Sequence, residues 1–211
     1  MKISQLQYIS PQYTDNTYFS HIQEIIDAGI KWVQIRVKDI DEETWLDIAT
    51  KAVEMCHRQK VICIINDNPE IALKSGADGV HLGKNDMLPS QARTIIGKNK
   101  IIGGTANTID DIRTLVSEGV DYIGLGPFRF TTTKKNLSPI LGIDGYKAIM
   151  HQCKNEHIST PIVAIGGITH DDITGICETG IYGIAVSGFI AQSSDKKKVV
   201  ESIQKTMQNV L

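Results

Sequence analysis

One short pattern occurs four times along this chain of 211 residues and restricts the folds that it can adopt. In each copy a helix-like stretch ends at a glycine, and an apolar strand-like run begins two or three residues later. The copies span residues 28–35, 75–82, 118–125 and 179–186. Glycine suits the left-handed backbone conformation that commonly ends a helix. The pattern therefore predicts helices that lead repeatedly into strands.

Further strands and helices alternate with these four copies. Additional strands are predicted over 6–10, 61–66, 101–105 and 161–166, and helices over 18–28, 43–59, 69–74, 89–96, 109–117, 143–152, 171–178 and 196–210. Strict alternation favours parallel strands, and continuous apolar strands indicate that helices cover their outer face. Eight such units in about 210 residues match the lower size limit of a (β/α)₈ barrel. We predict an α/β fold in which residues 1–211 form a single TIM-barrel domain, with a doubly wound open sheet as the alternative.

Composition excludes several classes of partner. The chain has 22 Lys and Arg against 24 Asp and Glu, so it carries no basic field suited to nucleic acid. No apolar run approaches the roughly 20 residues of a membrane helix, and the N-terminus lacks an apolar signal core. The four cysteines show no metal-binding spacing. We expect a cytoplasmic protein without membrane or nucleic-acid partners, and a homo-oligomer stays open as its assembly state.

Polar residues alternate with aliphatic ones where the second predicted strand ends. Gln34, Arg36 and Lys38 share one face, and the aliphatic residues between them share the other. The aliphatic face should meet the helices, so the polar face should point into the upper barrel. Buried cations without partners cost several kcal/mol each, a cost that an anionic ligand removes. The pattern favours a phosphate-type site over a solvated strand edge.

Carboxylates follow the third and fourth predicted strands. Asn66 and Asp67 end one strand, and Asp86 follows the other. Together Asp67 and Asp86 are suited to Mg²⁺, which often takes one or two carboxylates along with substrate phosphates and water. The alternatives are a helix cap for Asp67 and a turn for Asp86. His81 lies within the fourth strand, where a hydrogen-bonded core histidine is a better interpretation than a general base.

The loop after the sixth predicted strand is unusually long. It runs over 127–142, beyond the usual 2–6 residues, which favours a functional lid over a solvated mobile loop. Its hydroxyl and ammonium groups are suited to phosphate oxygens, notably those of Thr131, Thr133 and Lys134. Small residues after the last two strands allow backbone N–H groups to approach an anion; they are Gly167, Ser187 and Gly188.

Two anion-binding regions emerge at the strand ends. The cationic region, with metal-binding potential, comprises Arg36, Lys38, Asn66, Asp67, Asp86 and Lys134. The neutral region, rich in backbone donors, comprises Thr131, Thr133, Gly167, Ser187 and Gly188. A diphosphate needs the stronger charge neutralisation, whereas backbone and hydroxyl groups can hold a monophosphate. The two regions therefore predict two phosphorylated small-molecule substrates.

These residues resemble the thiamine phosphate synthase family over nearly the whole chain. The matching segments are 34–38, 65–67, 79–86, 124–127, 131–135 and 165–168. The combination of the Gln-x-Arg-x-Lys strand with the Thr-x-Thr-Lys loop is much more specific than either alone. The resemblance implies a transferase that joins 4-amino-2-methyl-5-(diphosphooxymethyl)pyrimidine to hydroxyethylthiazole phosphate, giving thiamine phosphate and diphosphate.

The resemblance also implies a role for each matching residue. The pyrimidine diphosphate would be held by Gln34, Arg36, Lys38, Asn66, Thr105 and Lys134, among which Arg36, Lys38 and Lys134 would be catalytic cations. The Mg²⁺ cofactor would be bound by Asp67 and Asp86. The thiazole phosphate would be held by Thr131, Thr133, Gly167, Ser187 and Gly188. Diphosphate departure from a methylene on an electron-rich ring favours a dissociative path, which needs charge stabilisation and no base.

The chain departs from the family pattern at three places. Thr105 replaces a common serine, Asn68 replaces an arginine or aspartate, and Ser187-Gly188 occupies the place of a Val-Ser pair. The related thiazole tautomerases resemble the chain too, but they carry a histidine where Asn107 lies and lack the Thr-x-Thr-Lys loop. Other phosphate-barrel enzymes, such as a sugar-phosphate epimerase or lyase, and a non-catalytic phosphate-binding paralogue are the further alternatives.

Overall fold

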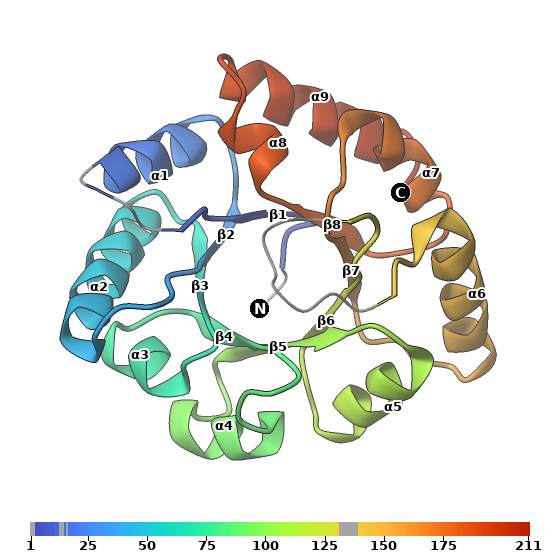
Figure 1. Cartoon of the computed structure of the whole chain (residues 1–211), viewed down its shortest axis with the longest axis horizontal. Coiled ribbons are helices and arrows are strands. Elements are labelled where there is room, and N and C mark those ends of the chain that lie inside the picture. The colour runs from blue at the N-terminus through green and yellow to red at the C-terminus, as the bar shows by residue number, and fades with distance from the viewer. Residues whose placement is uncertain (1–2, 13–14, 16, 131–138) are drawn as a thin grey trace.

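Eight parallel strands close into a barrel in chain order, as the computed structural model shows for residues 3–12, 15, 17–130 and 139–211 (Figure 1). The strands are β1 (Leu6–Ile9), β2 (Trp32–Ile35), β3 (Ile62–Asn66), β4 (Gly79–Leu82), β5 (Ile101–Ala106), β6 (Tyr122–Leu125), β7 (Ile162–Ile165) and β8 (Gly183–Val186). Each pairs with its neighbours in parallel, and β8 pairs with β1. The predicted (β/α)₈ barrel is confirmed, and the open-sheet alternative is wrong.

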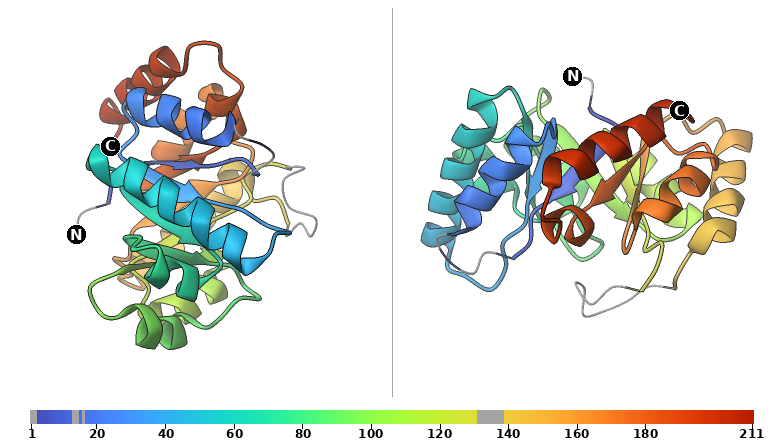
Figure 2. Two further views of the ribbon diagram at one scale, coloured as in Figure 1. Left: turned by 90° about the vertical axis from the view of Figure 1, so that its left-hand side faces the viewer. Right: turned by 90° about the horizontal axis from the view of Figure 1, so that it is seen from above.

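Helices surround the barrel on its outside (Figures 1 and 2). They are α1 (Thr17–Asp27), α2 (Glu42–Arg58), α3 (Pro69–Lys74), α4 (Pro89–Ile96), α5 (Ile109–Ser117), α6 (Gly142–Asn155), α7 (Ile173–Cys177), α8 (Gly188–Ala191) and α9 (Lys196–Gln208), with a 3₁₀ turn η1 (His170–Asp172). The predicted helix over 171–178 is divided into η1 and α7, and α8 was not predicted. In the part of the chain that the structure describes, no helix combines the length and apolarity of a membrane span.

The four glycines of the repeated pattern adopt the predicted left-handed conformation. The φ angles of Gly29, Gly76, Gly119 and Gly180 lie between 75° and 100°. A Cβ atom built on any of them would meet nothing within 4 Å, so backbone conformation and not space explains the glycines. The pattern thus predicted where four helices end and their strands begin.

Apolar side chains form two cores, one on each side of the strands. Val33 and Ile35 belong to the large core between strands and helices, as the alternation in β2 predicted. Trp32, Ile64 and Tyr122 belong to a smaller cluster inside the barrel. The strands are therefore buried on both faces, which leaves their carboxyl ends and the loops beyond them as the place for chemistry.

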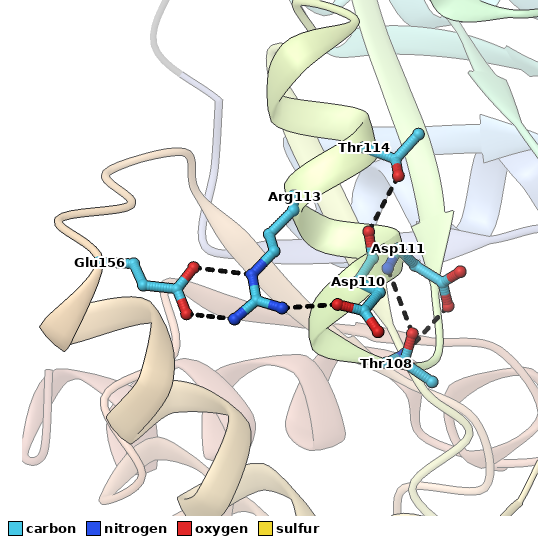
Figure 3. Close-up of polar contacts among 6 residues, drawn as sticks. All are labelled: Thr108, Asp110, Asp111, Arg113, Thr114 and Glu156. Carbon is cyan, nitrogen blue, oxygen red and sulfur yellow. Dashed lines mark hydrogen bonds and ion pairs between the residues drawn. The ribbon is translucent and has the colours of Figure 1, made fainter.

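Polar contacts fix the start of α5 and connect it to α6 (Figure 3). Thr108 and Asp111 form a capping box at the first turn of α5. Arg113 donates from Nε and Nη2 to the Glu156 carboxylate, at 2.9 and 2.5 Å, and its Nη1 contacts Asp110. These side chains are largely solvent-exposed, so the pairs contribute little stability, although they orient two neighbouring helices.

Candidate functional site

The polar residues of β2 divide into a buried amide and two cations at its carboxyl end. Gln34 is 2% exposed, and its side chain lies close enough to the Tyr122 hydroxyl to lower the pKa of that group, although Nε2 makes no well-formed hydrogen bond within the described part of the chain. The strand ends at Ile35, so Arg36 is half-buried and Lys38 is exposed. Lys38 Nζ pairs with Asp67 Oδ2 at 2.9 Å. The expectation of two buried, unpartnered cations is therefore wrong for Lys38, because both side chains lie beyond the last strand residue.

Asp67 lies directly after β3 in a left-handed conformation with φ 67°. Its backbone N–H donates to the carbonyl of His81 at 2.8 Å, which ties the end of β3 to β4. The helix cap predicted as an alternative for Asp67 is instead Asn68, whose side chain accepts from the N–H of Ile71 at 3.0 Å. The carboxylate of Asp67 is consequently directed to Lys38 and away from capping.

Asp86 is both a turn residue and a neighbour of Asp67. Its Oδ2 accepts the N–H of Gly83 at 2.6 Å, and a Cβ atom on Gly83 would lie 2.9 Å from that oxygen. Burial, then the hydrogen bond and repulsion between its carboxyl group and that of Asp67, raise the pKa of Asp86. The turn interpretation is confirmed, and the two carboxyl groups predicted to act together are in contact.

The pair of carboxyl groups suits a divalent cation in one respect. Two hard oxygen donors repel each other here, and a bound dication would relieve that repulsion. Within residues 3–12, 15, 17–130 and 139–211, no group of three His, Cys, Asp or Glu side chains is placed to hold a metal. A metal at Asp67 and Asp86 would need its other ligands from substrate or water.

His81 is a core histidine whose two ring nitrogens are both hydrogen-bonded. Nδ1 lies 2.9 Å from the hydroxyl of Tyr122, and Nε2 lies 3.0 Å from Oγ1 of Thr105. Its 5% exposure agrees with the predicted core role. Thr105 lies near the end of β5 and is half-buried, so its hydroxyl connects the barrel interior with the carboxyl end. Asn66, the last residue of β3, is buried and pairs with His81 in the register of β3 and β4.

The long loop after β6 is anchored at its two described ends. Phe128 and Arg129 donate backbone N–H groups to the carbonyls of Ile165 and Gly166, at 2.9 and 3.0 Å. At the other end, the N–H of Leu141 donates to the carbonyl of Pro127 at 3.0 Å. The loop therefore starts against the end of β7, and its far end returns to its own first residues. The site candidates Thr131, Thr133 and Lys134 lie outside the described residues.

Arg129 adds a contact that sequence reasoning missed. Its two Nη atoms bind the Asp172 carboxylate at 2.8 and 2.9 Å, and Nη1 also donates to the carbonyl of Gly167. Burial would raise the pKa of Asp172, but hydrogen bonds from Arg129 and Thr169 prevail and lower it. The sequence signal for this contact was an arginine in the loop predicted to act as a lid. Its partner could not be identified from the sequence, because Asp172 lies 43 residues away.

The described residues predicted for the neutral region, Gly167, Ser187 and Gly188, follow β7 and β8. Gly167 has φ 69°, and a Cβ atom there would approach Arg129 to 3.0 Å. Ser187 precedes α8, and Gly188 is the first residue of that four-residue helix. Gly167 is thus in contact with the start of the long loop through Arg129, whereas Ser187 and Gly188 follow the neighbouring strand.

Asn107, the position that distinguishes the tautomerases, has a structural role. It is buried, and its Nδ2 donates to the carbonyl of Gly126. Its backbone N–H donates to Oδ2 of Asp111, which Lys84 also contacts, at 2.7 Å. These contacts join the loops after β4, β5 and β6 at the same end of the barrel.

A separate hollow of about 460 Å³ lies at the opposite, amino end of the strands. It is lined by Ile3, Lys98, Asn99, Lys100, Ile101, Asp121, Pro161 and Tyr182. None of the predicted site residues lines it, and the chemistry of (β/α)₈ barrels belongs to the other end. We therefore assign the site to the carboxyl end.

Comparisons with known proteins agree with this geometry. The thiamine monophosphate synthase family model matches residues 6–190. A thiamine-phosphate synthase of Flavobacterium johnsoniae is 47% identical over 209 residues, covering 99% of each chain. One of Bacteroides thetaiotaomicron is 48% identical over 190 residues, covering 90% of this chain and 91% of the relative. Thiamine phosphate pyrophosphorylase of Pyrococcus furiosus superposes with a TM-score of 0.83 at 27% identity, covering 98% and 96%.

Proposed function

The chain belongs to the thiamine monophosphate synthase family and is an enzyme of that type, and we propose that it couples two phosphorylated heterocycles at the carboxyl end of its barrel. The substrates are 4-amino-2-methyl-5-(diphosphooxymethyl)pyrimidine and hydroxyethylthiazole phosphate. The observation that carries the proposal is the contact of Lys38 with Asp67 and of Asp67 with Asp86, after three neighbouring strands. A cation beside two carboxylates is suited to a diphosphate bound together with a divalent metal.

In this proposal the diphosphate is held by Gln34, Arg36, Lys38, Asn66, Thr105 and Lys134. The half-buried position of Arg36 supports its role, because a partly desolvated guanidinium binds a phosphate oxygen strongly. Lys38 reaches the same region and exchanges part of its contact with Asp67 for the diphosphate. Nε2 of Gln34 makes no well-formed hydrogen bond among the described residues and supplies a further donor.

Mg²⁺ would be held by Asp67 and Asp86, whose oxygen donors fit its preference. When bound, Mg²⁺ neutralises charge that develops on the departing diphosphate. Gly83 orients Asp86 through the 2.6 Å hydrogen bond to its Oδ2, and Asn68 caps α3 in place of Asp67. The chain therefore presents two carboxylates whose mutual repulsion favours a cation.

Hydroxyethylthiazole phosphate would be held by Thr131, Thr133, Gly167, Ser187 and Gly188. The positive φ of Gly167 supports close approach of an anion to the backbone, since a side chain there would crowd Arg129. Arg129 connects this region to the base of the loop through Asp172 and the carbonyl of Gly167. The two substrates would thus lie against neighbouring parts of one barrel mouth.

The reaction follows a dissociative path in this proposal. The bond between the pyrimidine methylene and the diphosphate oxygen breaks, and the bond between that methylene and the thiazole nitrogen forms. Arg36, Lys38 and Lys134 stabilise the leaving diphosphate as fixed cations. The thiazole nitrogen is already an unprotonated nucleophile, so no base is needed. This agrees with His81, both of whose ring nitrogens are committed to other side chains.

A coupling assay tests the proposed activity. The purified protein is mixed with both substrates and Mg²⁺, and thiamine phosphate is detected by thiochrome fluorescence, with EDTA as the control. Product that disappears with EDTA is expected. Lys134→Ala should lower turnover much more than it lowers thermal stability, whereas an unfolded variant with unchanged activity per folded molecule would contradict its role. A complete absence of product from intact substrates would favour a tautomerase or a non-catalytic phosphate-binding barrel.

The proposal extends to the setting in which the enzyme works. The cysteines in the structure are all buried and free, which suits a reducing compartment such as the cytoplasm. We also retain the hypothesis that residues 1–211 form one domain, which the closed barrel supports. Limited proteolysis tests it, because one domain should resist cleavage between its strands.

A further inference from the structure

A line of buried polar side chains crosses the inside of the barrel from β1 to the end of β5. Gln7 Nε2 lies 3.4 Å from the hydroxyl of Tyr122, which lies 2.9 Å from Nδ1 of His81. Nε2 of His81 then lies 3.0 Å from Oγ1 of Thr105. Gln7, Tyr122 and His81 are at most 5% exposed, whereas Thr105 is half-buried at the site.

The chemistry of each group gives this line a direction. The amide nitrogen of Gln7 can only donate, so the hydroxyl oxygen of Tyr122 accepts from it. Burial raises the pKa of Tyr122 and outweighs the lowering by the side chains of Gln7 and Gln34, so its hydroxyl keeps its proton. With the Gln7 amide donating to its oxygen, that proton is available to Nδ1 of His81, 2.9 Å away. A neutral imidazole that accepts at Nδ1 carries its hydrogen on Nε2. Nε2 therefore donates to Thr105.

Thr105 is the last member of the line. Its oxygen accepts from His81, which leaves the hydroxyl hydrogen of Thr105 to be donated to another group. In the proposed function that group belongs to the pyrimidine substrate, whose ring nitrogens are acceptors. A threonine hydroxyl can otherwise either donate or accept, so a fixed direction would favour substrates with an acceptor at this position.

The barrel makes space for this line in its strands. A Cβ atom on Gly103 would lie 2.2 Å from Tyr122 and 2.5 Å from Nδ1 of His81, and one on Gly124 would lie 3.1 Å from Cε1 of His81. Trp32 packs edge-on against Tyr122, with ring centroids 4.8 Å apart. The rings of Tyr122 and His81 are thus confined to the positions in which they make these hydrogen bonds.

We infer that Gln7, Tyr122 and His81 fix the hydrogen of His81 on Nε2 and thereby make the Thr105 hydroxyl a hydrogen-bond donor to the pyrimidine substrate. Tyr122 and His81 are then positioning residues, which act on the substrate through Thr105. The inference rests on the proposed function for the identity of the substrate, but the direction of the hydrogen bonds can be measured without it.

The substrate link is tested by a double-mutant cycle on KM for the pyrimidine diphosphate. Thr105→Val and Tyr122→Phe should each raise KM about tenfold, the value of one hydrogen bond to a bound substrate. The double variant should be no worse than Thr105→Val alone, because Tyr122 acts through Thr105. Multiplying effects would overturn the inference, since Tyr122 would then act independently of Thr105.

Two controls accompany the cycle. Tyr8→Phe removes another buried tyrosine hydroxyl that contacts a histidine, His21 Nε2 at 2.6 Å, but on the outer side of the strands. It should leave KM within about twofold of the wild-type value, since it is remote from Thr105. Thr105→Ser retains the hydroxyl and should restore most of the binding that Thr105→Val loses. A KM for Thr105→Ser equal to that of Thr105→Val would overturn the role of the hydroxyl.

The wild-type protein supplies a measurement that no folding defect can compromise. In a long-range ¹H–¹⁵N correlation spectrum, His81 should show a protonated Nε2 and an unprotonated Nδ1 at neutral pH. A protonated Nδ1 in an active protein would overturn the inferred direction and leave the proposed function standing. The expected tautomer in a protein that makes no thiamine phosphate would confirm the direction and overturn the proposed function.

Discussion

Replacing Gly103 with alanine should destabilise the protein strongly, because the barrel interior has no space for a methyl group there. The added Cβ would lie 2.2 Å from Cζ of Tyr122. Carbon atoms in contact normally lie about 3.5–4.0 Å apart, so the ring would have to move by about 1.5 Å. Tyr122 is fully buried against Trp32 and cannot move without disturbing it.

The cost has two parts. Overpacking of a core costs about 1–3 kcal/mol, and losing the hydrogen bonds of Tyr122 to Gln7 and His81 costs about 1 kcal/mol each. The free energy of unfolding should therefore fall by about 3–5 kcal/mol, against a typical total of about 5–15 kcal/mol. At about 2–4 °C per kcal/mol for a protein of this size, Tm should fall by about 6–20 °C.

Urea and thermal unfolding followed by circular dichroism measure this loss. Gly175→Ala, within α7, is the matched control, since among the described residues its Cβ would meet only Cδ1 of Ile143 in α6, at 3.3 Å. That variant should stay within about 1 kcal/mol of the wild type, because alanine also favours the helix. A Gly103→Ala variant as stable as the wild type would refute the close packing of Tyr122 and His81 against β5.

Three further predictions concern the helix ends, the loop base and the metal. Gly119 and His157 both have positive φ, which glycine adopts more readily than other residues. Gly119→Ala should therefore lower the free energy of unfolding by about 1 kcal/mol in urea titrations, whereas His157→Gly should not lower it. Arg129→Gln should remove stability at neutral pH. The pKa of Asp172 is lowered in the folded protein, so the stability that this carboxylate contributes is fully present above about pH 4 and is lost as pH falls through the lowered pKa. Thermal unfolding from pH 2 to 7 should therefore show the Tm curves of the variant and the wild type converging in acid. Asp86→Asn should raise Tm slightly without Mg²⁺, because it removes the repulsion from Asp67, and should abolish the rise in Tm that Mg²⁺ gives the wild type. Unchanged Mg²⁺ titration in Asp67→Ala would remove Asp67 from the metal site.

The alternation of strands and helices could be predicted because its signals are local. A glycine with φ near 75–100° ends a helix through its own backbone, so Gly29, Gly76, Gly119 and Gly180 marked boundaries without knowledge of the fold. Side-chain alternation likewise placed Val33 and Ile35 toward the helices. The short helix α8 gave no such signal, because four residues cannot show a helical period.

The place of the candidate residues in the fold was predictable, but their contacts were less so. Strand ends marked Asp67 and Asp86, yet the sequence could not decide whether Asp67 or Asn68 caps α3. Burial of Lys38 was misjudged, because the residue at which β2 ends is set by pairing with β1 and β3. The contact between Gln7 and Tyr122 joins residues 115 apart in sequence, which only barrel closure brings together.

In the proposed function, the ends of β2, β3 and β4 form a metal-dependent diphosphate site. Isothermal titration of inorganic diphosphate into the protein, with and without Mg²⁺, tests it most directly. Arg36→Met is the test variant, and Lys31→Met, an exposed cation at the amino end of β2, is the charge-matched control. Binding that requires Mg²⁺, survives in Lys31→Met and is lost in Arg36→Met is the expected result. Diphosphate that binds equally well without Mg²⁺, or to Arg36→Met, would contradict the account.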